Sequence, residues 1–92
     1  MNVYIVKGHT GEYSDRNDWI VCAYQDKDKA ELLVKNASRR ASEIFAEMER
    51  DILNSWYGER NDLKYINEYD PSMQMDYTGT YYTYDATELR DA

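Results

Sequence analysis

Two short stretches near the start of the chain are rich in β-branched and aromatic residues, a composition that is typical of β-strands. They are residues 2–7 (NVYIVK) and residues 18–24 (DWIVCAY). Residues 8–17 between them hold two glycines and small polar side chains, which favour a loop, so this region predicts a β-hairpin. Apolar side chains fall on both faces of each strand. This pattern predicts a helix over one face and a second cover, which a partner can supply, over the other.

Apolar residues recur every three or four positions from residue 27 to residue 56, which predicts one long amphipathic helix. Asp26 is the expected N-cap, and Gly58 is the expected stop. A helix of this length would extend about 45 Å, so it either protrudes from a small domain or breaks near residues 36–38. The apolar positions keep their phase there, which favours a continuous helix. These positions are Ala30, Leu33, Val34, Ala37, Ala41, Ile44, Phe45, Met48, Ile52 and Trp56.

Residues 77–86 (YTGTYYTYDA) are the best third strand, because tyrosine and threonine favour extended backbone, and Gly79 is expected to mark a bulge. Asp70 and Pro71 predict a turn, and residues 60–67 fit a short helix or a strand. The simplest assembly is an α+β fold, with a three-stranded antiparallel sheet in ββαβ order and the long helix packed on one face. We expect residues 1–92 to form a single domain, because the chain is too short for two.

Length and charge exclude several classes of function. The chain has 92 residues and a formal net charge of −7, which disfavours direct binding to duplex DNA or to an anionic membrane and favours a basic protein as partner. No apolar run approaches the ~20 residues that span a bilayer, and the start of the chain is too polar for a signal peptide, so we expect a cytoplasmic protein. One histidine and one cysteine cannot supply the usual zinc ligands, and we expect no metal or cofactor.

Few residues are arranged for catalysis. His9 lies in a glycine-flanked loop and has Ser14, Asp15 and Asp18 near it in sequence, so a serine–histidine–aspartate arrangement can be drawn. Such triads are recognised by geometry, however, and any chain offers these residue types. Cys22 lies inside an apolar stretch and is expected to be a small buried hydrophobe. We therefore predict no catalytic residue and a non-enzymatic protein. A small enzyme that uses His9 and neighbouring acids is the less favoured alternative.

The last third of the chain combines negative charge with tyrosine. Residues 57–92 hold eight acidic and three basic residues, together with seven of the ten tyrosines. Tyrosine is enriched at protein interfaces, so carboxylates interleaved with tyrosines suit a surface that binds an Arg- and Lys-rich protein. A solvated acidic surface, with tyrosine serving the strands, explains the same pattern. The candidate partner-binding residues here are Glu68, Asp70, Asp76, Tyr69, Tyr77 and Tyr81.

The predicted helix carries two further charged groups. Glu43, Glu47 and Asp51 form an acidic row at i, i+4 and i+8, close to the helix end where the macrodipole disfavours acids, so we add them to the candidate partner-binding residues. A basic patch one or two turns earlier is a candidate contact for RNA or for an acidic protein. It consists of Lys35, Arg39 and Arg40.

Four segments carry a resemblance that extends over most of the chain: the opening MNVYIVKG, then DWIVCAY, then DKDKAELL, and the tail YYTYDATELRDA. Together they resemble small phage-encoded accessory proteins and, more narrowly, an anti-CRISPR protein of the type I-F inhibitor group. The resemblance implies a non-enzymatic inhibitor in the cytoplasm of the bacterial host. Such an inhibitor binds basic protein subunits of a type I CRISPR RNA-guided surveillance complex (Cascade/Csy), with possible contact to guide RNA, and blocks target DNA recognition or hybridisation.

The alternative function is a small acidic phage regulator or homodimeric adaptor. Such a protein would dimerise through the uncovered face of the sheet and would bind another basic protein. A strong homodimer in sedimentation, combined with no affinity for a surveillance complex, would favour this alternative over the inhibitor.

Overall fold

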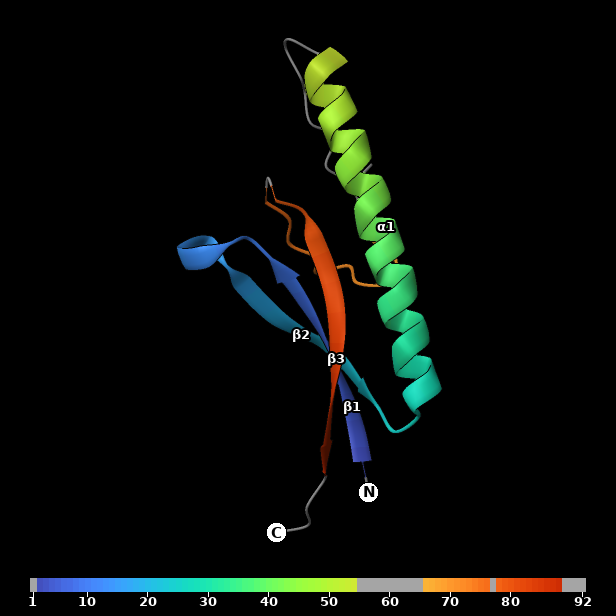
Figure 1. The fold of residues 1–92 in the computed structure, drawn as a ribbon. Helices are drawn as coiled ribbons and strands as arrows, with labels where there is room; N and C mark the ends of the chain where they lie inside the picture. Colours follow the sequence, from blue (N-terminus) through green and yellow to red (C-terminus); the bar gives the residue numbers. More distant parts are fainter. Residues whose placement is uncertain (1, 55–65, 77, 89–92) are drawn as a thin grey trace.

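The fold in the computed structural model is one long helix packed against a three-stranded antiparallel sheet (Figure 1). The structure describes residues 2–54, 66–76 and 78–88, with backbone only for 51–54. In chain order the elements are β1 (Asn2–Thr10), a 3-10 turn η1 (Tyr13–Asp15), β2 (Asn17–Tyr24), α1 (Lys27–Asn54) and β3 (Thr80–Glu88). The predicted α+β fold and its ββαβ order are confirmed.

The strands lie in the order β2-β1-β3, so β1 is central and is antiparallel to both neighbours. The predicted hairpin is confirmed, but both of its strands are longer than expected and leave only residues 11–16 as the loop. The bulge lies in the β1–β2 pairing, where the register shifts between Val6 and Lys7. The bulge predicted at Gly79 is wrong. Gly79 has φ +90° in the turn before β3, a conformation that favours glycine.

The two faces of the sheet differ in what covers them. Register places Val6, Gly8 and Tyr82 on one face, and α1 packs there, with Ala37 and Ala41 buried in one cluster with Tyr82. Small helix residues allow this close approach. Gly8 is required for a similar reason, because a Cβ there would lie 2.3 Å from Cε2 of Trp19. The opposite face, which we call the open face, carries Ile5, Lys7, His9, Asp18, Ile20, Ala23, Tyr81, Thr83 and Asp85.

The helix is continuous through residues 36–38, as the phase of its apolar positions predicted. Its N-cap is also confirmed, because the Asp26 carboxylate accepts the backbone N–H of Asp28 at 2.9 Å. Figure 1 shows the C-terminal half of α1 extending past the strands, and the molecule measures 55 × 27 × 17 Å. The expected stop at Gly58 lies outside the described residues. The turn at Asp70 is confirmed by a hydrogen bond from the N–H of Met73 to the carbonyl of Asp70 at 3.0 Å.

Candidate functional site

The loop that joins β1 and β2 presents a tyrosine in an unusual conformation. Tyr13 has φ +53°, in the left-handed region that residues other than glycine rarely adopt, and 95% of it is exposed. Two backbone hydrogen bonds hold the turn around it: the N–H of Asp15 donates to the carbonyl of Glu12 at 3.1 Å, and the N–H of Arg16 donates to the carbonyl of Tyr13 at 3.2 Å. Gly11 starts the loop at φ +86°, where a Cβ would lie 2.3 Å from the carbonyl oxygen of Asp15.

A second loop segment, which contains Asp76, Thr78 and Gly79, is hydrogen-bonded to the start of the first loop. The hydroxyl of Thr10 donates to the carbonyl of Gly79 at 2.6 Å and accepts the N–H of Asp76 at 3.0 Å, and the N–H of Gly11 donates to the hydroxyl of Thr78 at 3.1 Å. The Thr78 hydroxyl also donates to the Asp76 carboxylate and lowers the pKa of Asp76 below its usual value. The two loops therefore form one supported unit with a charged Asp76.

The two loops border a shallow, open hollow of about 620 Å³. Glu12 and the rings of Tyr13 and Tyr81 line it, and Asp15 lies on the same loop. Arg16 also lines it, but its guanidinium is bonded to the carboxylate of Asp18 at 3.2 Å. Aromatic rings beside carboxylates attract cationic side chains. We call the group Glu12, Tyr13, Asp15 and Asp76 the hairpin end.

His9 links all three strands on the open face. Its Nδ1 lies 2.7 Å from Oδ1 of Asp18 in β2, and its Nε2 lies 2.6 Å from Oγ1 of Thr83 in β3. The Tyr81 ring stacks on the imidazole, with 4.9 Å between centroids and 21° between planes. The hydrogen bond from His9 is the main cause that lowers the pKa of Asp18.

The distances from His9 to the Asp18 carboxylate and to the Thr83 hydroxyl resemble those in a catalytic triad, but the contacts of His9 indicate a structural role, as a brace between strands. Both imidazole nitrogens are satisfied by neighbouring strands, and Tyr81 covers one face of the ring. Ser14, which the sequence places near His9, is exposed in η1 instead. His9 is only 8% exposed, and its bonds to Asp18 and Thr83 hold β2 and β3 to β1 on the open face.

Asp70, which the sequence identified as a partner-binding candidate, lies in the interior with 3% exposure. Its Oδ2 accepts hydrogen bonds from Nε1 of Trp19 and from the hydroxyl of Tyr82, both at 2.8 Å. Burial and the Asp70 carboxylate together raise the pKa of Tyr82 far above its usual value. Asp70 therefore attaches residues 66–76 to the covered face. The signal for a buried acceptor in the sequence was that the Trp19 indole N–H and the Tyr82 hydroxyl each need an acceptor when they are buried.

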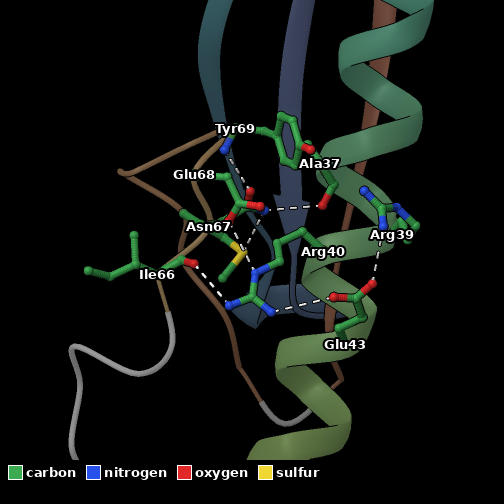
Figure 2. A network of polar contacts seen from close by, with 9 residues as sticks. Ala37, Arg39, Arg40, Glu43, Ile66, Asn67, Glu68 and Tyr69 are labelled. Carbon is green, nitrogen blue, oxygen red and sulfur yellow. Dashed lines mark hydrogen bonds and ion pairs between the residues drawn. The ribbon is translucent and has the colours of Figure 1, made fainter.

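Asn67 forms a second buried attachment, which the sequence analysis did not identify (Figure 2). Its Nδ2 donates to the carbonyl of Ala37 in mid-helix at 3.1 Å, and its Oδ1 accepts the N–H of Tyr69 at 3.0 Å. Tyr69 is half-buried and packs against the core cluster. The side chain of Asn67 thus joins the 66–76 segment to α1, and Tyr69 contributes more to packing than to the surface.

Three charged candidates on the helix, Arg39, Arg40 and Glu43, pair with one another or with Glu68 of the 66–76 segment, as Figure 2 shows. Arg40 bonds to Glu68 at 3.2 Å, to Glu43 at 3.5 Å and to the carbonyl of Ile66 at 3.4 Å. Arg39 lies 3.5 Å from Glu43. This pairing reduces the charge that the basic patch offers to RNA.

The remaining candidate residues are spread over the molecule. Lys35 is exposed, Glu47 is half-buried, and Tyr81 is 51% exposed on the open face. Tyr77 and the side chain of Asp51 lie outside the described residues. Asp76 belongs to the hairpin end and Tyr81 lines the same hollow, whereas Arg39, Arg40, Glu43 and Glu68 form a separate group on and beside α1.

Comparison with protein-family models, with curated proteins and with solved structures finds no match for this chain. Across residues 2–54, 66–76 and 78–88, no helix is long and apolar enough to cross a membrane. The same residues contain no group of three or more His, Cys, Asp or Glu side chains placed to hold a metal ion.

Proposed function

We propose that this protein binds a basic surface of another protein through its hairpin end and acts by occupying that surface, without chemical reaction. The observation that carries the proposal is Tyr13, a bulky side chain that is held in a left-handed conformation and is 95% exposed. A left-handed conformation costs a residue of this type about 1 kcal/mol or more. Because the ring buries almost no surface within the chain, it contributes almost no free energy to folding. Binding gains that free energy when a partner buries the ring.

The charges around Tyr13 favour a basic partner. Glu12 and Asp15 are exposed on the same turn as Tyr13, and the lowered pKa of Asp76 keeps a third carboxylate charged nearby. The net charge of −7 adds long-range attraction, which speeds association and weakens as salt shortens the screening length below about 8 Å. A partner arginine or lysine can place its cation between Glu12 and the Tyr13 ring. Tyrosine anchors of this kind contribute about 2 kcal/mol or more to binding.

The resemblance noted in the sequence suggests which partner to test first. RNA-guided complexes hold their heteroduplex in positively charged channels, which a folded anionic surface can enter without displacing bases. We propose that the basic protein subunits of a type I-F surveillance complex are the partner and that blocked target DNA recognition is the effect. This proposal places the protein in the cytoplasm of a phage-infected bacterium.

The test is inhibition of target DNA binding by the purified type I-F surveillance complex. Wild-type protein at a concentration equal to that of the complex should abolish the shift of labelled target DNA in a gel. The double variant Glu12→Lys/Asp15→Lys should need at least tenfold more protein for the same inhibition. The matched control is Asp28→Lys/Glu49→Lys, which makes the same change in net charge at two exposed acids of α1 and should inhibit like the wild type.

The outcomes test the contact surface and the identity of the partner separately. Equal inhibition by both double variants would remove the hairpin end as the contact surface. If the wild-type protein does not inhibit the complex at all, the surveillance complex is not the partner, and the acidic regulator of another basic protein becomes the favoured function.

A further inference from the structure

The open face of the sheet carries exposed apolar side chains although it belongs to a strongly polar chain. Ile20 is 69% exposed and Tyr81 is 51% exposed, and both line a hollow of about 610 Å³ on this face. Ala23 is also exposed, and it pairs with Ile5 on the same face. In the part of the chain that the structure describes, α1 packs only on the other face. The open face therefore has an apolar centre surrounded by polar groups, which is the usual composition of a protein interface.

Charges on the open face cancel. Lys7 Nζ lies 2.9 Å from the Asp85 carboxylate, and Arg16 lies 3.2 Å from Asp18 at the edge of the same hollow. Two positive and two negative side chains therefore leave this region neutral on a chain of net charge −7. Two such chains repel each other at most orientations, and a neutral surface is where they can approach.

The open face is also rigid. The bonds from His9 to Asp18 and Thr83 connect all three strands, and Tyr81 is fixed by stacking on the imidazole. Ordering side chains on association costs about 0.5–1.5 kcal/mol for each flexible group, so a surface fixed in advance binds at lower cost.

We infer that the open face binds the open face of a second copy of this chain, in a symmetric dimer centred on Ile20. A second copy fits because the surface is neutral and carries charges of both signs, so that across a two-fold axis the positive side chains of each copy can face the negative side chains of the other. Strands of this length span about 30 Å, and three strands give a footprint of roughly 400 Å², which is below the ~800 Å² per partner of a standard interface. The dimer is therefore weak and dissociates on dilution.

Sedimentation velocity over a concentration series from about 10 µM to about 1 mM tests this inference. The wild-type protein should shift from monomer to dimer across the series. Ile20→Asp should raise the dissociation constant at least tenfold, because it places two carboxylates at the centre of the interface. The matched control is Leu32→Asp, which makes the same change at an aliphatic residue of similar exposure, 58%, on α1, and it should dimerise like the wild type.

A second variant keeps the test valid if Ile20→Asp fails to fold, which circular dichroism would reveal. Ala23→Lys adds a charge at an exposed position of the same face and should also weaken the dimer at least tenfold. Wild-type protein that stays monomeric at the highest concentration would overturn the inference, as would a dimer that persists in both open-face variants. The inference does not depend on the proposed function, because sedimentation needs no partner and Tyr13 is left intact.

Discussion

The two faces of the sheet use similar polar groups in opposite settings. On the covered face, Asp70 is buried and accepts hydrogen bonds from Trp19 and Tyr82. On the open face, Asp18 is exposed and bonds to His9, which itself is nearly buried. The comparison teaches that the burial of a carboxylate decides its role. Asp70 holds the fold together, whereas Asp18 and His9 stiffen a surface that remains available for binding.

Replacing the buried carboxylate should have the largest effect on stability. Asp70→Ala leaves the Trp19 indole N–H and the Tyr82 hydroxyl without their acceptor, and each buried donor left unpaired costs about 1–3 kcal/mol. We expect the free energy of unfolding in urea to fall by about 3 kcal/mol, with a smaller fall for Asp70→Asn, which keeps one acceptor oxygen. A loss below about 1 kcal/mol would show that Asp70 does not anchor the 66–76 segment.

Removing the brace on the open face should cost less. His9→Ala breaks two hydrogen bonds, but their partners Asp18 and Thr83 are more exposed than the histidine and can bond to water instead, so we expect a loss of about 1–2 kcal/mol in the same urea experiment. Asp70→Ala should therefore lower the free energy of unfolding more than His9→Ala does. The reverse order would contradict the assignment of Asp70 to the core and His9 to a surface brace.

Acid should weaken the open-face brace in a defined direction. The pKa of Asp18 is lowered in the folded protein, chiefly by the hydrogen bond from His9, so its carboxylate favours folding at every pH above the unfolded value of about 3.8. That contribution is lost as the pH falls through the unfolded and then the folded pKa. In urea unfolding between pH 6 and pH 3, the stability gap between wild type and Asp18→Asn should narrow toward the acid end, because protonation of Asp18 removes its extra stabilisation. A stability gap that stays constant with pH would show that Asp18 is not preferentially charged in the fold.

The smallest expected change is a gain in stability at the hairpin end. Tyr13→Asn removes an exposed ring and replaces it with a residue that tolerates φ +53°, so thermal unfolding should occur at an equal or slightly higher temperature, a gain of up to about 1 kcal/mol. A marked loss of stability would mean that Tyr13 contributes to folding and is not reserved for a partner.

The fold was predictable because periodicity and capping are local signals. Apolar spacing identified α1 and its continuity, Asp26 marked its start, and β-branched residues identified β1 and β2. The site was less predictable because burial depends on contacts between residues distant in sequence. Asp70 beside a proline has the sequence signature of a surface turn, and it is the contacts with Trp19 and Tyr82, 51 and 12 positions away, that hold it inside. The left-handed backbone at Tyr13 could not be predicted from the sequence, because the glycine that usually marks such a conformation does not occupy this position.

Titration of the surveillance complex with this protein in a calorimeter tests the central claim most directly. The claim predicts saturable binding by wild-type protein and, for Tyr13→Asn, an affinity lower by roughly thirtyfold, about 2 kcal/mol, with thermal stability retained. Full-strength binding by stable Tyr13→Asn protein would contradict the claim that this exposed ring anchors the partner.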